Sequence, residues 1–136
     1  MKLSSAILSF ALAAASAAAS AADGLIELKS PHAAKATMDK LEELVKQRGL
    51  SVFARIDHAA GAAKVNKSLR ATELLIFGNP QGGTPLMECA QSAGIDLPLK
   101  ALAWEDAQGQ SWLGYNDPAW LAQRHGAAAC PVVENL

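Results

Sequence analysis

The chain has 136 residues, of which 51% are hydrophobic and 18% are charged, and its formal net charge is −1. This length suits one domain with a real core and is too short for two domains. Acidic and basic residues nearly balance and the arginines are scattered, which excludes the basic stripe typical of a nucleic-acid-binding protein.

The first residues are typical of a secretory signal peptide. Lys2 supplies a minimal basic start, residues 3–19 are apolar or small almost throughout, and Ser20-Ala21-Ala22 offers a small-x-small cleavage site. The alternative is a membrane-anchoring helix, but the segment is rich in Ala and Ser and no basic stop-transfer cluster follows it. We expect residues 1–22 to be removed, leaving a periplasmic or secreted protein without a stable membrane span.

A strand and a helix are expected first in the mature chain. Residues 24–30 alternate between apolar and polar side chains, as in a strand. Ser30 and Pro31 combine an N-cap with a proline at the first helical position, and Gly49 is suited to end the helix. The sequence therefore predicts a helix between these two signals.

Two more strands are expected next. Residues 50–58 alternate, with one face expected to carry Leu50, Val52, Ala54 and Ile56. Residues 59–69 are small and mildly helical. Residues 71–78 form a nearly continuous apolar run, which is typical of a central strand covered on both faces.

The second half of the chain continues the alternation. Helices are expected at residues 84–94 and 117–126, each beginning with a capping residue followed by a proline. Between them, residues 97–106 and 110–116 alternate on either side of Gly109, which is a hairpin signal. Trp104 and Trp112 are expected to form a cross-strand pair that packs under a helix; the alternative is an aromatic ligand wall or a dimer patch.

Together the elements predict an α+β fold. We expect a single domain over residues 23–126, followed by a C-terminal tail at residues 127–136. The sheet should have about five strands, mixed but mostly antiparallel, with helices packed on it in the order β-α-β-(α)-β-α-β-β-α.

The two cysteines admit two interpretations. In an oxidising compartment an even count favours a disulfide, here between Cys89 and Cys130. The alternative is a buried thiol at Cys89 and a free thiol at Cys130 in the tail.

A glycine-rich loop at residues 78–84 joins a strand to a helix, which is the layout of phosphate-binding loops. A Walker-type loop needs a lysine after its last glycine, but Thr84 stands there and Pro85 follows. We therefore expect a turn in which Gly83 has positive φ and Thr84 caps the next helix. The amides of Gly82 and Gly83 still offer a site for a small neutral or weakly anionic ligand.

His58 is the histidine that best fits a functional site, because it ends the second strand in phase with that strand's apolar residues. In the alternative interpretation, Asp57 caps the following turn and His58 bonds a backbone carbonyl. The candidate ligand-binding residues are Asp57, His58, Asn79, Gly82, Gly83 and Thr84.

A transition-metal site is a further candidate. The sequence has no H-E-x-x-H, H-x-x-E-H or C-x-x-C spacing, so no recognised metal motif is present. His58, Met87 and Cys89 carry the soft ligand atoms that copper prefers, provided that the fold brings them together. The sequence assigns no cofactor.

Four phrases in order resemble the bacterial and archaeal domain-of-unknown-function family 302. They are "ARIDHAAGA", "LLIFGNPQGGTPLM", "DLPLKALAWED" and "GYNDPAWLAQRHG", and the resemblance covers residues 24–126. It implies a small α+β domain, in some members a dimer, with no assigned activity. The cysteines are not part of the resemblance.

These observations favour an exported domain that binds a small molecule or a protein partner without catalysis, as a homodimer. One alternative is an enzyme of unrecognised type with His58 as acid or base and Asp57 or Glu88 nearby. The other is a copper or transition-metal protein.

Overall fold

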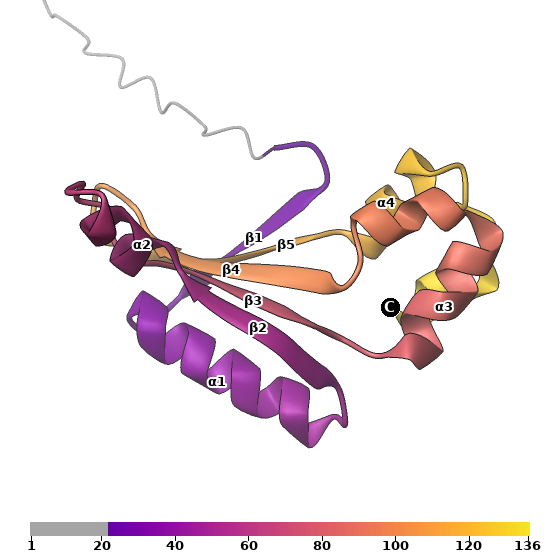
Figure 1. Cartoon of the computed structure of the whole chain (residues 1–136), viewed down its shortest axis with the longest axis horizontal. Coiled ribbons are helices and arrows are strands. Elements are labelled where there is room, and N and C mark those ends of the chain that lie inside the picture. Colours follow the sequence, from indigo (N-terminus) through magenta and orange to yellow (C-terminus); the bar gives the residue numbers. More distant parts are fainter. Residues whose placement is uncertain (1–21) are drawn as a thin grey trace, which may run out of the picture.

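The computed structural model describes residues 22–136 (Figure 1). Nearly all of the expected signal peptide, residues 1–22, lies outside this range.

Five strands form one sheet in which every neighbouring pair is antiparallel. Across the sheet the strands follow the order β1-β5-β4-β3-β2. The strands are β1 Leu25–Ser30, β2 Ser51–Asp57, β3 Thr72–Gly78, β4 Leu99–Glu105 and β5 Ser111–Asn116. The expected α+β class, strand number and element order are confirmed, while the sheet contains no parallel pair among the described strands.

The helices divide between one face of the sheet and its two ends. The long helix α1 covers one face, while α2 lies at one end and α3 and α4 lie at the other (Figure 1). The helices are α1 Ala34–Gln47, α2 His58–Lys64, α3 Pro80–Cys89 and α4 Pro118–Arg124, with 3₁₀ segments η1 Gln91–Ile95 and η2 Pro131–Asn135.

The main core lies between α1 and the sheet. Ala34, Met38 and Val45 of α1 pack against Leu75 of β3 and Ala103 of β4, and all five are buried. Full burial of Met38 and Leu75 contributes about 2 kcal/mol each by transfer of apolar surface from water.

The predicted start of α1 is wrong by three residues. Ser30 ends β1, and the N-cap position is Ala33, which makes no side-chain cap. The hydroxyl of Ser30 is instead hydrogen-bonded to the hydroxyl of Thr37, a side chain in the first turn of α1. Ser30 thus links the strand to the helix without belonging to the helix.

A β-bulge near Phe53 changes the faces of β2. Val52 pairs with Phe77, but Ala54 already pairs with Ile76, so the extra residue shifts the alternation by one. Val52 packs against the α1 core, and the next side chain on that face is Arg55. The expectation that Val52, Ala54 and Ile56 share one face is therefore wrong.

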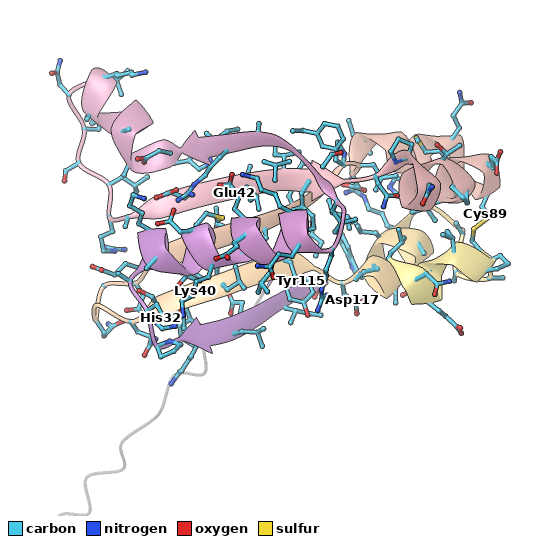
Figure 2. All side chains as sticks on the ribbon, turned by 90° about the horizontal axis from the view of Figure 1, so that it is seen from below. His32, Lys40, Glu42, Cys89, Tyr115 and Asp117 are labelled. Atoms are coloured by element: carbon cyan, nitrogen blue, oxygen red, sulfur yellow. A yellow bond between two sulfur atoms is a disulfide. The ribbon has the colours of Figure 1, made fainter. Side chains whose placement is uncertain are left out.

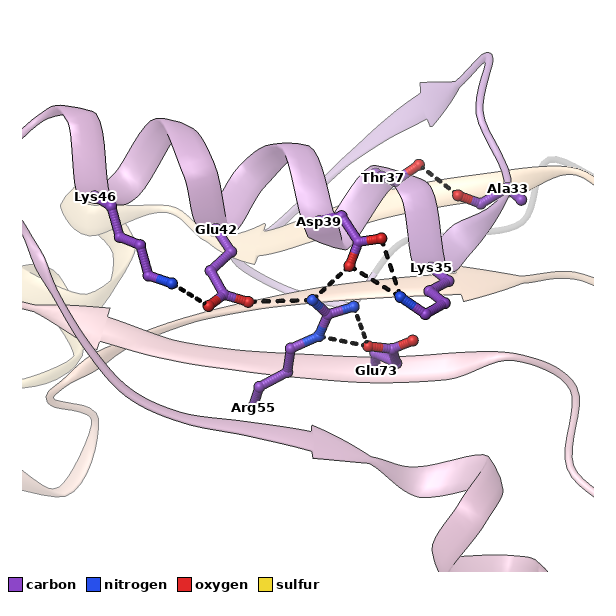
Figure 3. Close-up of polar contacts among 8 residues, drawn as sticks. All are labelled: Ala33, Lys35, Thr37, Asp39, Glu42, Lys46, Arg55 and Glu73. Atoms are coloured by element: carbon purple, nitrogen blue, oxygen red, sulfur yellow. Dashed lines mark hydrogen bonds and ion pairs between the residues drawn. The ribbon is translucent and has the colours of Figure 1, made fainter.

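Arg55 is the centre of an ion-pair cluster that fastens α1 to β2 and β3 (Figure 3). Its guanidinium donates to Asp39 at 2.7 Å and Glu42 at 3.1 Å on α1, and its Nη2 lies 2.6 Å from Glu73 of β3. Partial burial opposes the charge on Arg55, but the three carboxylates outweigh this effect and raise its pKa above the ordinary value.

The same ion pairs act on the carboxyl groups. Hydrogen bonds from Arg55 and Lys35 lower the pKa of Asp39, and those from Lys46 and Arg55 lower the pKa of Glu42. Both carboxylates are therefore held in the charged form.

Residues of the expected C-terminal tail, 127–136, take part in a second core. Ala127 and Cys130 are buried together with Leu86, Ala93 and Ala122. We call this body, made of α3, η1, α4 and η2, the helical lobe. Its elements are tied by a disulfide between Cys89 and Cys130, whose Cα atoms are 6.1 Å apart (Figure 2). The structure thus contains the bridge that was one of the two interpretations.

The β4–β5 hairpin forms as expected, but its tryptophans face the other way. Trp104 and Trp112 are a directly paired, stacked couple with ring centroids 6.4 Å apart. Because the preceding residue Ala103 faces α1, both rings lie on the sheet face opposite that helix. The Trp112 indole donates to Asp106 at 2.8 Å and lowers the pKa of that carboxyl.

Candidate functional site

The glycine-rich segment after β3 is the first turn of a helix. Asn79 is the N-cap of α3, and its side-chain oxygen accepts from the amide of Gly82 at 2.9 Å. Pro80 follows at the first helical position. The predicted cap at Thr84 is wrong, because the Asn79–Pro80 pair gives the same signal five residues earlier.

The backbone of this segment leaves little for an anion to bind. The amide of Gly82 is taken by Asn79, and the amide of Gly83 donates to the Asn79 carbonyl at 3.1 Å. Gly83 does not have positive φ, contrary to the expectation. Both amides are therefore committed within the helix and do not form a free pair of donors for a ligand.

A cavity of about 330 Å³ nevertheless lies against this segment, and we call it the loop cavity. Loop residues Gly78, Asn79, Pro80, Gly82, Gly83 and Thr84 form one wall. The remaining lining is mainly apolar and comes from β2, β4 and the helical lobe: Leu50, Phe53, Met87, Gly94, Leu97, Pro98, Leu99, Asn135 and Leu136. The structure thus brings four of the six predicted ligand-binding residues to one cavity.

A second cavity of about 370 Å³ lies between α1, the sheet and the helical lobe. It shares Leu50, Leu99 and Leu136 with the loop cavity. Tyr115, which lies where the sheet meets the lobe, is part of its wall (Figure 2). Leu50, Leu99 and Leu136 therefore form a wall that is common to two mainly apolar spaces.

Asp57 and His58 lie at the opposite end of the sheet from the loop cavity. Asp57 pairs with Glu73 near the start of β3, whereas the loop follows Gly78 at its end. A strand of this length spans about 20 Å. Asp57 caps α2 by accepting from the amide of Ala60 at 2.8 Å, and His58 is exposed. The cap matches the structural interpretation of Asp57, and the separation of His58 from the loop removes the shared cleft that an enzyme based on His58 needs.

The candidate metal ligands do not come together either. Cys89 is bonded to Cys130, and Met87 lies on α3 at the far end of the sheet from His58. Between residues 22 and 136, no group of three or more His, Cys, Asp or Glu side chains is arranged to hold a metal ion.

One polar chain in the helical lobe was missed at the sequence level. His125, at the end of α4, lies between Ser92 and Asp96 of the η1 region, at 2.9 and 2.6 Å. The Asp96 carboxylate also accepts from Arg124 at 3.0 and 3.1 Å. In the sequence His125 lies within the helix expected at residues 117–126, and no local motif indicates its hydrogen-bond partners about 30 residues away.

Comparison with known proteins places the domain in a family. The family model described as "Domain of unknown function DUF302" matches residues 26–136. A crystal structure of an uncharacterized conserved DUF302 protein from Bacillus stearothermophilus superposes with a TM-score of 0.74 and 19% identity, covering 84% of this chain and 90% of that chain. At this identity the likeness concerns the fold.

Curated relatives carry a functional name. The chain is 51% identical over 102 residues to "Fluoride-specific ion channel FluC 1" of Brucella suis biovar 1 (strain 1330), a match that covers 75% of this chain and 40% of the relative. "Fluoride-specific ion channel FluC 1" of Brucella abortus biovar 1 (strain 9-941) matches at the same identity over 38% of its length. The chain thus spans about two fifths of these relatives.

Across the part of the chain that the structure describes, every helix is too short or too polar to cross a membrane.

Proposed function

The chain belongs to the DUF302 family, and from that premise we propose that it is an exported domain that binds a small, mainly apolar molecule in the loop cavity. The observation that carries this proposal is the cavity itself. Its volume of about 330 Å³ lies in the range of small-molecule sites, and its lining is mostly apolar with Asn79, Thr84 and Asn135 as polar groups.

The chemistry of the loop supports an uncharged ligand. The amides of Gly82 and Gly83 are both used within α3, so the segment offers no free pair of donors to a phosphate. Burial of apolar ligand surface against Leu97, Leu99 and Met87 would supply the binding free energy instead.

The test compares how tightly a neutral apolar fluorophore, N-phenyl-1-naphthylamine, binds to the wild type and to a variant whose loop cavity is filled by a side chain. A Cβ on Gly83 meets Leu97 at 3.5 Å, an ordinary contact, so Gly83→Leu places a side chain in the cavity without backbone strain. Gly61→Leu is the matched control, because a Cβ there meets nothing within 4 Å. We expect the wild type and Gly61→Leu to bind the probe and Gly83→Leu to bind at least about 10-fold more weakly. Equal binding by all three proteins would exclude the loop cavity as the site.

Two features support export. The start of the sequence has the composition of a signal peptide. The Cys89–Cys130 bridge is of the kind that persists in oxidising compartments. The expected result is a mature protein that begins at residue 23 in the periplasm or medium, as read by N-terminal mass spectrometry.

A second candidate function is that of a partner module for a membrane channel. The support is the 51% identity over 102 residues to proteins named fluoride-specific ion channels. Because this chain spans two fifths of them, we propose that the remaining part of those relatives conducts fluoride and that the shared domain acts beside it.

Proteoliposomes that contain the Brucella suis relative with or without its matching segment would test this second function. We expect the truncated channel to differ from the intact one in fluoride efflux, and addition of this chain to shift the rate back towards the intact value. An unchanged rate, together with no measurable binding of this chain to the truncated channel, would reject the partner role.

We also propose that the domain forms a homodimer through the edge of β1, consistent with the family resemblance. Among the described strands β1 pairs only with β5, and Leu28 of β1 is 49% exposed. Glu27 and Lys29, on either side of Leu28 in the strand, share the sheet face opposite to that of Leu28. A two-fold axis at Leu28 would place Glu27 of each copy opposite Lys29 of the other, a favourable cross-strand pair.

A further inference from the structure

The geometry around His125 fixes the direction of its hydrogen bonds. A carboxylate can only accept, so Nε2 of His125 carries the hydrogen that faces Asp96 at 2.6 Å. In the neutral ring the other nitrogen, Nδ1, then has a free lone pair. This lone pair faces the hydroxyl of Ser92 at 2.9 Å and accepts its proton in a hydrogen bond.

Among the hydrogen-bonded side chains of Ser92, His125 and Asp96, the imidazole base is buried and the serine is accessible. The His125 side chain is 7% exposed and that of Asp96 is 15% exposed, while Ser92 is an exposed residue. Arg124 donates to both oxygens of Asp96 and fixes the carboxylate from its other side. The imidazole is therefore held in one orientation, and the oxygen that it activates is open to solvent.

We propose that Ser92, His125 and Asp96 form a serine nucleophile with its general base and orienting carboxylate, and that the chain hydrolyses carboxylic esters with apolar acyl groups. A nucleophile and a base within hydrogen-bond reach, with a third group that orients the base, define such a site irrespective of sequence order. This activity goes beyond ligand binding in the loop cavity.

The reaction follows from the positions of the atoms. Ser92 Oγ bonds to the ester carbonyl carbon while its proton moves to His125 Nδ1. The same proton passes to the alcohol oxygen as the carbon–oxygen bond breaks, which leaves an acyl group on Ser92. Water then attacks the acyl carbon, its proton goes to His125 and on to Ser92 Oγ, and the carboxylic acid leaves. Asp96 keeps its hydrogen bond to Nε2 and acts as a positioning residue.

The preference for an ester with an apolar acyl group is inferred from the cavities near Ser92 and Asp96. Gly94, two residues after Ser92 in η1, lines the loop cavity, and Asp96 lines the second cavity. Both cavities are walled mainly by leucines and other apolar residues. An acyl chain that extends from Ser92 towards either cavity would be buried from water.

The experiment is covalent labelling of the intact mature protein with a fluorophosphonate probe, followed by peptide mapping and by assays with p-nitrophenyl acetate and octanoate. We expect one adduct, on Ser92, with no adduct in Ser92→Ala and wild-type labelling in the control Ser68→Ala. His125→Gln should slow labelling at least about 100-fold, the usual contribution of a general base. His58→Gln, at an exposed histidine, should not change it.

The readouts separate catalysis from a structural role of the same hydrogen bonds. Asp96→Asn should change the pH profile of labelling, whereas a merely structural aspartate would leave the profile unchanged. If His125→Gln does not fold, the proposal is still tested by the adduct map of the wild type and by Ser92→Ala, a substitution at an exposed position. Absence of an adduct, an adduct elsewhere, or equal ester turnover by Ser92→Ala would overturn the proposal. Equal turnover of acetate and octanoate would overturn the apolar acyl group.

Discussion

The side-chain oxygen of Asn79 accepts a hydrogen bond from the amide of Gly82 at 2.9 Å, and this contact begins α3. We therefore expect Asn79→Ala to destabilise the domain by about 1 kcal/mol, the usual loss for such a cap. Thr84→Ala should change the free energy of unfolding by less than about 0.5 kcal/mol, because Thr84 is exposed within the helix. Urea denaturation of both variants measures the difference, and a larger loss in Thr84→Ala would contradict the assignment of the cap.

Because of the Arg55 cluster, we expect the stability of the domain to depend on pH in the acidic range. Asp39 and Glu42 have folded-state pKa values below the ordinary 3.8 and 4.5, so both bind protons less readily when the protein is folded. Their contribution is complete above these ordinary values and is lost as the pH falls below them. Thermal melts of the wild type between pH 7 and pH 2.5 should therefore show a falling midpoint below about pH 4.5.

Arg55→Met isolates this contribution. The variant should melt at a lower temperature than the wild type at pH 7, and the gap between the two should narrow as the pH falls through the same range. Arg48→Met, at an exposed arginine outside the ion pairs of the described residues, is the control and should track the wild type. A constant gap at every pH would show that Arg55 stabilises the domain by packing alone.

The bridge between Cys89 and Cys130 closes a loop of 41 residues. In the chain-entropy model, a loop of this length is worth on the order of 4 kcal/mol. We expect a Cys89→Ala/Cys130→Ala protein to lose a comparable amount in urea denaturation, and added reductant to lower the stability of the wild type but not that of the double variant. A wild type that is insensitive to complete reduction would contradict this expectation.

The proposed dimer edge can be tested by charge exchange. Glu27→Lys or Lys29→Glu alone puts like charges opposite each other twice, which should weaken self-association about 10-fold. The double variant Glu27→Lys/Lys29→Glu restores opposite charges and should restore association. Light scattering over a concentration series provides the measurement. A monomer at all concentrations, or single and double variants that behave alike, would reject this interface.

Local signals predicted most of the fold. Alternation, capping residues and the turn at Gly109 were enough for the α+β class and the order of its elements, because these depend on neighbours in the chain. The predictions were wrong where contacts beyond the immediate neighbours in the sequence determine the structure. The bulge at Phe53 changes the faces of β2 through pairing with β3, and Ser30 bonds Thr37 instead of capping α1.

The candidate site was predictable in part for the same reason. Four of the predicted residues line one cavity because they lie close together in the sequence, at the start of α3. His58 was grouped with them although it lies at the other end of the sheet. The hydrogen bonds that run from Ser92 through His125 to Asp96 join η1 to α4. No periodicity reports that kind of contact, because it depends on the packing of the helical lobe.

Leu136, together with Leu50 and Leu99, lines both cavities, so the two spaces share a wall of apolar side chains. A molecule that pushes the Leu136 side chain out of one space narrows the other, so two occupants would bind with negative cooperativity. Thermodynamic linkage makes the effect reciprocal, since each ligand must weaken the other by the same factor. Leu136→Ala removes one of the three shared side chains and should weaken this antagonism. With Leu136 in place, the wild-type domain would respond to one molecule by releasing another, although its strands and helices stay where they are.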